Sequence, residues 1–267
     1  MSFFVHELDP IIVTIGPVRI GWYGFLFLCS FLLAYIFVKI NYEKKGVKLL
    51  SDQYESFMIN IMCGVMVGGR LGYVLFYNFS YYFENPLRIL YVWEGGMSFH
   101  GGAIGVILVA LFFCKKYKQD FFALADPAMP LVAVGLGLGR IANFINGELY
   151  GRVTDLPWAV IFINTDPEML PRHPSQLYEA LFEGFLMAVF LQIVLLKSNI
   201  KGLIFWLFIG GYGIVRFLIE YIRIPDDLPM YQNGLLFGFF SMGQVLSIVM
   251  IFSAIIGVSI AVRKRIH

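Results

Sequence analysis

One polar string, Gly139 to Gly151, ends an apolar segment and carries side chains suited to chemistry. It includes Arg140, and Asn143 and Asn146 follow at three-residue intervals, which places the three groups along one helical stripe. An arginine inside a bilayer costs about 2.5–3.5 kcal/mol on insertion scales, so it is rarely left without a partner or a function. Glu148 comes where the helix should leave the membrane. A guanidinium beside amides and a carboxylate predicts a site for an anionic lipid headgroup, although an interhelical tie or a snorkelled anchor would use the same residues.

Two further arginines lie in other apolar segments. Arg216 has Glu220 four residues later, so the two could form an ion pair, or Glu220 could orient Arg216 towards a phosphate. Arg70 is a candidate for binding substrate and equally for a structural tie. Glu179 and Glu183 are possible partners for the arginines.

His100 lies in a glycine-rich stretch, Gly95 to Gly102, followed by Gly105. The glycines let a backbone or a ligand come close, and an imidazole can accept a proton at neutral pH. A hydrogen-bonded histidine at the membrane interface is the alternative. The histidines are isolated, with no carboxylate or second histidine at ligand spacing, so we expect neither a metal nor another cofactor.

The composition indicates the class of protein that must position these residues. The chain has 267 residues, of which 59% are hydrophobic and 14% charged. This predicts an all-α polytopic membrane protein. Seven apolar segments are long enough to cross a bilayer: residues 20–40, 57–77, 96–114, 124–145, 177–196, 202–221 and 235–262.

The lysines indicate the orientation of these segments. All of them fall within residues 39–48, 115–118, 197–201 and at Lys264, which are alternate loops and the C-terminal end. By the positive-inside rule, the N-terminus is then outside and the C-terminus cytoplasmic. Since the basic loops are accounted for by topology, we do not expect nucleic-acid binding.

One outer connection, residues 146–175, is long and rich in Pro, Asp and Asn, with a strand-like run from Trp158 to Ile163. This predicts a small extracytoplasmic cap with a short hairpin, between the fourth and fifth spans. No linker divides the chain, so we expect a single domain over residues 1–267 with the cap as an insertion.

The topology places polar residues from different spans at one depth. Six of them should lie towards the outer leaflet: Tyr23, Arg70, His100, Arg140, Arg216 and Gln244. A transporter would instead line a path through both leaflets, and an intramembrane protease would need a nucleophile with a paired base or two aspartates. Both remain alternatives, but the pattern favours chemistry at the outer face of the membrane.

The string from Gly139 to Gly151 closely resembles the signature of the bacterial prolipoprotein diacylglyceryl transferases. Further matches follow the family order along nearly the whole chain: Gly21–Gly24, Gly68–Arg70, Gly96–Gly102, His173–Glu179, Arg216 with Glu220, and Ser241–Gln244.

The resemblance implies a seven-span enzyme of the bacterial inner membrane that moves the diacylglyceryl group of phosphatidylglycerol to the lipobox cysteine of a preprolipoprotein. A thioether forms and glycerol 1-phosphate is released. By the same resemblance, Arg140 binds the lipid phosphate with help from Arg216, and His100 matches the proposed base. Tyr23, Asn143 and Gly151 match positions needed for activity, and Glu148 and Glu220 match supporting ones.

Overall fold

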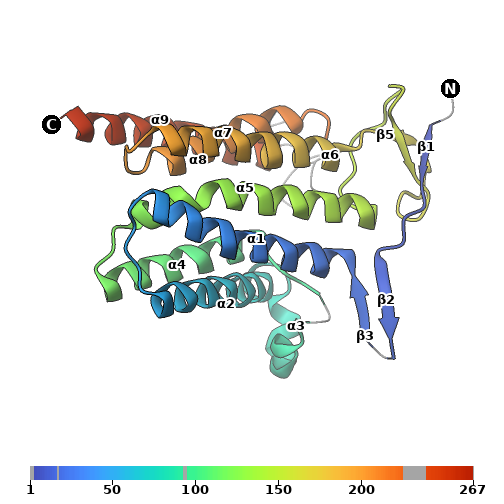
Figure 1. Cartoon of the computed structure of the whole chain (residues 1–267). Coiled ribbons are helices and arrows are strands. Elements are labelled where there is room, and N and C mark those ends of the chain that lie inside the picture. Colours follow the sequence, from blue (N-terminus) through green and yellow to red (C-terminus); the bar gives the residue numbers. More distant parts are fainter. Residues whose placement is uncertain (1–2, 17, 93–94, 225–238, 267) are drawn as a thin grey trace. The chain divides into compact units, whose positions relative to one another are not determined.

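The computed structural model describes residues 3–16, 18–92, 95–224 and 239–266 (Figure 1). The chain forms two compact units. The first combines Met1–Lys45 with Ala125–His267, and the second is Gly46–Leu124.

Long helices dominate the first unit. They are α1 (Trp22–Lys44), α5 (Phe121–Asn146, which begins in the second unit), α7 (Leu186–Lys197), α8 (Leu203–Ile219) and α9 (Met242–Ile266). A short helix α6 (Ser175–Glu179) and a π-helical turn η3 (Ala180–Phe185) run directly into α7. Ala133, Leu191 and Ile204 are central to an apolar core that joins α5, α7 and α8.

Polar groups in the span-forming helices of this unit have structural partners. Asn41 and Gln192 exchange two side-chain hydrogen bonds, and Asn41 also donates to the carbonyl of Pro127, inside α5. Asp126 accepts the backbone N–H groups of Gly202 and Phe205 at 2.6 and 2.9 Å. These two N–H groups belong to the first turn of α8, where a helix lacks internal acceptors, so Asp126 caps α8.

The second unit is built on α2 (Ser51–Phe76) and α4 (Phe99–Tyr117), joined through α3 (Phe79–Glu84) and η1 (Pro86–Leu90). Glycines allow α2 and α4 to come unusually close. A Cβ on Gly72 would lie 2.7 Å from the Cα of Gly101, and one on Gly64 would lie 3.0 Å from the carbonyl oxygen of Gly105. Small residues at such contacts are typical of helix pairs in membranes.

A small sheet covers one end of the first unit. β1 (Phe4–His6) pairs in parallel with β4 (Val160–Phe162), and β4 pairs antiparallel with β5 (Pro171–Arg172). The predicted hairpin within residues 146–175 is confirmed. β1 was not predicted from the sequence, and neither was the hairpin of β2 (Ile11–Ile15) and β3 (Val18–Gly21) that leads into α1. An all-α description therefore leaves out these strands.

Within the described residues, six helices are long and apolar enough to cross a membrane, by length and composition: α1, α2, α4, α5, the continuous helix Ser175–Lys197, and Met242–Arg265. A mostly helical, polytopic membrane protein is therefore confirmed. The predicted sixth segment, 202–221, corresponds to α8, which has 17 residues and is counted among the shorter apolar helices. The predicted start of the last segment at residue 235 lies outside the described residues, and seven crossings with their orientation stay a prediction.

Candidate functional site

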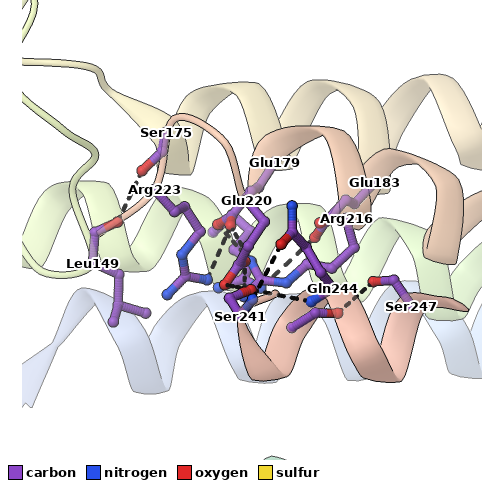
Figure 2. Close-up of polar contacts among 12 residues, drawn as sticks. Leu149, Ser175, Glu179, Glu183, Arg216, Glu220, Arg223, Ser241, Gln244 and Ser247 are labelled. Carbon is purple, nitrogen blue, oxygen red and sulfur yellow. Dashed lines mark hydrogen bonds and ion pairs between the residues drawn. The ribbon is translucent and has the colours of Figure 1, made fainter. Parts of the chain in front are cut away.

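Three arginines and three glutamates meet between helices of the first unit, and Figure 2 labels all of them except Arg140. We call this set the arginine–glutamate cluster: Arg140 from α5, Glu179 and Glu183 from the α6–η3 helix, Arg216 from α8, and Glu220 and Arg223 directly after α8. The prediction that Glu179 and Glu183 could partner the arginines is confirmed by their contacts with Arg140.

Glu179 is the centre of the cluster. Its side chain is fully buried and contacts all three arginines. Nε of Arg140 lies 3.1 Å from Oε2, and Nη1 of Arg216 and of Arg223 lie 2.7 and 3.2 Å from Oε1. A carboxylate has lone pairs for several charge-assisted bonds, so this single residue fixes the positions of three guanidinium groups.

Arg216 bridges two carboxylates. Its Nη2 lies 3.0 Å from Oε2 of Glu220, in addition to its bond to Glu179. The predicted Arg216–Glu220 ion pair is therefore present, and Arg216 is also tied to a second helix. Glu220 accepts a hydrogen bond from the hydroxyl of Ser241 at 2.8 Å. It is thus oriented by the residue that precedes α9.

Ser241 and Gln244 form a reciprocal cap at the start of α9. The backbone N–H of Ser241 donates to Oε1 of Gln244, and the backbone N–H of Gln244 donates to the hydroxyl oxygen of Ser241, at 3.1 and 3.2 Å. This pattern is a capping box. It gives Gln244 a structural role in holding Ser241, and through it Glu220.

Glu183 is bound much more loosely than the other two acids. Its side chain is 0% exposed, and Oε2 lies 3.7 Å from Nη2 of Arg140. Neither of its oxygens has a hydrogen-bond partner among the described residues. Tyr212 of α8 lies within electrostatic reach of both Arg140 and Glu183. Among the described residues, Glu183 is therefore a buried acid whose negative charge is balanced by arginines that do not hydrogen-bond to it.

Local backbone features bring Glu183 and Arg140 together. A π-turn such as η3 is uncommon and is often found at functional sites. Gly184, beside Glu183, packs directly on α5, because a Cβ there would lie 2.5 Å from the Cα of Gly137. Since Gly137 and Arg140 are three residues apart on α5, this close approach lies beside the arginine.

The asparagines of the α5 stripe bind a different carboxylate. Nδ2 of Asn143 and of Asn146 donate to Oε1 of Glu148 at 2.9 and 3.2 Å. Arg140 instead contacts Glu179 and Glu183, so the stripe divides between two sets of partners. Tyr23, in the first turn of α1, lies within electrostatic reach of both Glu148 and Arg140. The structure thereby brings Tyr23 and Glu148 to the edge of the cluster.

Position 151 has room only for a glycine. A Cβ at this position would lie 2.6 Å from the carbonyl oxygen of Ile222 and 2.8 Å from the Cβ of His173. Its N–H also donates to the carbonyl of His173 at 2.9 Å. Gly151 therefore joins the cap to the segment after α8, which contains Arg223.

Arg70, in the second unit, is saturated by backbone carbonyls. Its guanidinium donates to five of them at 2.5–3.2 Å, those of Arg88, Ile89, Tyr91, Gly95 and Gly96. A guanidinium has five N–H donors, so none is left for a phosphate. We therefore infer that Arg70 holds the backbone of η1 and of the residues after it in place. Of the two roles proposed from the sequence, the structural tie fits this geometry.

His100 is exposed in the first turn of α4. Ser98 precedes that turn, and its hydroxyl accepts the backbone N–H of Gly101 at 3.2 Å. Gly101 and Gly105 face α2, so their small size is explained by helix packing. A role for His100 as a base stays a prediction. His100 and Arg70 belong to the second unit, so the common depth of the six polar residues also stays a prediction.

In the cap, a buried ion pair links Asp166 and Arg172. Nε and Nη2 of Arg172 lie 2.5 and 2.9 Å from the two carboxylate oxygens. These hydrogen bonds hold the pKa of Asp166 below its ordinary value, and they raise the pKa of Arg172. Burial lowers the pKa of the nearby His173. In the described part of the chain, no three His, Cys, Asp or Glu residues are grouped as metal ligands would be.

Arg223 is the residue of the cluster that was not predicted from the sequence as a site residue. It follows Arg216 by seven residues, which is two helical turns, but α8 ends at Ile219. Its backbone pairs with Gly151, and its side chain turns back to Glu179. The available signal was a third charged residue, and second arginine, close after Arg216 and Glu220.

These features define a polytopic membrane protein with a formally neutral arginine–glutamate cluster buried between its helices. The chain belongs to the prolipoprotein diacylglyceryl transferase family, whose model matches residues 10–260. It is 47% identical over 259 residues to the phosphatidylglycerol–prolipoprotein diacylglyceryl transferase of Geobacter sulfurreducens, covering 97% of this chain and 96% of that protein. It is 44% identical over 261 residues to the Vibrio parahaemolyticus protein of the same name, covering 98% and 93%.

Proposed function

We propose that this protein transfers the diacylglyceryl group of phosphatidylglycerol to the thiol of the lipobox cysteine of preprolipoproteins. The names of its relatives support this transfer and not the transporter or intramembrane protease considered as alternatives. The structural observation that supports the proposal most strongly is that buried carboxylates hold Arg140 and Arg216 while leaving some N–H donors of each guanidinium group free of them. Within the described residues, Nη1 of Arg140 and Nε of Arg216 contact no carboxylate.

The reaction replaces one bond with another at a single carbon. The cysteine sulfur forms a bond to the glyceryl carbon that bears the phosphate, and the C–O bond to that phosphate breaks. The electron pair of that bond leaves with glycerol 1-phosphate, and the thiol gives up its proton. The phosphate gains negative charge as it leaves, so fixed positive charge in a poorly hydrated site lowers the barrier.

The proposed roles follow from these requirements. Arg140 and Arg216 bind the phosphate, and Glu179 and Glu220 hold them in position. Glu148 presents the amides of Asn143 and Asn146 at the end of α5, with Tyr23 close to it. Gly151 keeps the cap and the segment of Arg223 in contact. His100 is the candidate base for the thiol. Arg70 is no longer proposed to bind substrate.

The proposal includes an arrangement in the membrane. The chain crosses the bacterial cytoplasmic membrane seven times as a single domain, with the N-terminus outside and the C-terminus in the cytoplasm. Residues 146–175 form the cap on the outer side. The lysines in alternate loops support this orientation. The lipid and the lipobox peptide then meet at the outer leaflet.

A defined assay tests the proposal. Purified protein in detergent is mixed with phosphatidylglycerol and a peptide containing a lipobox cysteine, and mass spectrometry follows the thioether product and glycerol 1-phosphate. Arg140→Ala should lower the rate by at least about 10²–10³-fold, the effect expected on losing a transition-state counter-charge. Arg140→Lys should recover little, because an ammonium lacks the planar fork of a guanidinium.

Arg19→Ala is the matched control, because Arg19 is an exposed arginine of β3. It should transfer at the wild-type rate. Near-normal transfer by folded Arg140→Ala protein would remove the phosphate-binding role. No product from the wild-type protein under conditions that keep it folded would remove the proposed function.

A further inference from the structure

Glu183 is a buried acid that the proposed reaction does not use. It is fully buried, and both carboxylate oxygens lack a hydrogen-bond partner among the described residues. A buried carboxylate in this condition is costly when it is ionised, since only charge pairing or hydrogen bonds offset its lost hydration. Such an acid changes its protonation state readily when the charge around it changes.

Charged and titratable groups act on Glu183 from several elements. Arg140 faces it from α5, Tyr212 and Arg216 from α8, and Arg223 from the segment after α8, while Glu179 lies one turn earlier on its own helix. The three guanidinium groups and three carboxylates of the cluster cancel when all are ionised. A lipid phosphate bound at Arg140 would therefore add an uncompensated negative charge to a buried site.

We propose that binding of the phospholipid phosphate at Arg140 is coupled to the uptake of one proton from solvent by Glu183. This inference rests on the proposed function for the place where the phosphate binds. The proton adds to a carboxylate oxygen of Glu183, so the cluster and the phosphate together stay neutral. Glu183 is thereby a positioning residue, which acts by releasing Arg140 to the phosphate.

The contacts distinguish Glu183 from the other two acids. Glu179 has three arginine contacts of 2.7–3.2 Å, so protonating it would leave the arginines without their common partner. Glu220 is paired with Arg216 at 3.0 Å and accepts the Ser241 hydroxyl at 2.8 Å. Among the described residues, the ion-pair contact of Glu183 is the 3.7 Å approach of Arg140 Nη2. Of the three acids, Glu183 therefore gives up the least favourable interaction energy when it is protonated.

The coupling has a definite sign. If the complex holds one proton more than the free protein, the affinity for the lipid falls as pH rises, by up to about tenfold per pH unit. Glu183→Gln mimics the protonated acid in size and charge. It should bind with the affinity that the wild type reaches at low pH, and this affinity should be independent of pH.

The test measures the dissociation constant of short-chain phosphatidylglycerol for the full-length protein in detergent, between about pH 6 and pH 9. The wild type should bind more weakly with rising pH, and Glu183→Gln should not. Glu168→Gln is the matched control, because its carboxylate is 65% exposed in the cap, and it should keep the wild-type slope. His100→Gln should also keep that slope. A pH-independent wild type, or a Glu183→Gln protein with the wild-type slope, would overturn the coupling.

A second measurement needs no variant at the cluster. Calorimetric titration of wild-type protein with the same lipid, in two buffers of different ionisation enthalpy, counts the protons taken up. We expect uptake approaching one proton at the alkaline end, and zero uptake throughout would reject the inference. Lipid transfer to a lipobox peptide is assayed in parallel at one pH. Transfer without proton-linked binding overturns the coupling alone, whereas proton-linked binding without transfer overturns the proposed function alone.

Discussion

Glutamates do most of the positioning in the arginine–glutamate cluster. Glu179 holds three guanidinium groups, and Glu220 connects Arg216 to the cap of α9. Removing one partner of a buried ion pair leaves the other charge uncompensated, typically at a cost of about 3–5 kcal/mol. A loss of activity at any cluster residue must therefore be compared with the folded fraction before it is assigned to chemistry.

The structure makes a specific prediction for Arg70. Arg70→Lys replaces five N–H donors by three, so at least two of the five carbonyls at residues 88, 89, 91, 95 and 96 lose their partner. An unmade buried hydrogen bond costs about 1–3 kcal/mol, and we expect a destabilisation of at least about 2 kcal/mol. Hydrogen exchange of these loop amides should rise, while the affinity for phosphatidylglycerol stays unchanged. Weakened lipid binding with normal loop protection would return Arg70 to the substrate site.

His100 has a separate test at the same scale. If its imidazole accepts the thiol proton, His100→Gln should slow transfer, and higher pH should restore part of the rate. The reason is that a thiol with a pKa near 8.5 supplies more thiolate as pH rises. Initial rates with a lipobox peptide across the pH range, corrected for folded fraction, measure this. A profile parallel to that of the wild type would remove the base assignment.

At the scale of elements, apolar length was the reliable signal. The segments predicted at 57–77 and 124–145 correspond to α2 and α5 within a few residues at most ends. This works because a span must satisfy its backbone internally and expose apolar side chains throughout. The interval between Arg216 and Glu220 predicted their ion pair for a similar reason, since residues four apart on a helix are neighbours.

Features that depend on distant partners could not be read from the sequence. β1 has three residues, and its partner β4 comes far later in the chain. In the sequence, Arg70 and Arg140 look alike, because each follows a glycine within an apolar segment. The carbonyls that surround Arg70 come from η1 and the residues after it, and the sequence does not show this path of the backbone. Arg223 reaches Glu179 because the chain turns after Ile219, and no local periodicity indicates that turn.

The cap gives a prediction on pH. Hydrogen bonds from Arg172 lower the pKa of Asp166 in the folded protein. The stabilisation is therefore complete above the unfolded value of about 3.9, and it is lost as pH falls through the lower folded value. Amide exchange in β4 and β5, corrected for intrinsic rates, should accelerate in acid for the wild type. Asp166→Asn should exchange faster at neutral pH and show little further change in acid.

At the scale of the whole molecule, α8 decides the topology. Its 17 residues give a length of about 25 Å at 1.5 Å per residue, somewhat less than a hydrocarbon core of about 30 Å. A short helix can still cross if the bilayer thins locally, at a modest cost. With α8 crossing, the cap and the C-terminal end lie on opposite sides of the membrane. Without it, they lie on the same side.

Single-cysteine labelling separates these two arrangements. In a background without Cys29, Cys63 and Cys114, cysteine is placed at Asn164, Lys116 or Lys264, all of which are exposed positions. In intact cells, an impermeant reagent should label the cysteine at 164 and should reach those at 116 and 264 only after permeabilisation. Labelling at both 164 and 264 would mean that α8 does not cross. Arg216 would then lie on the side opposite to Glu179, which the 2.7 Å distance between Nη1 of Arg216 and Oε1 of Glu179 contradicts. Labelling at 116 but not at 164 would reverse the orientation and place the proposed lipid site at the inner leaflet.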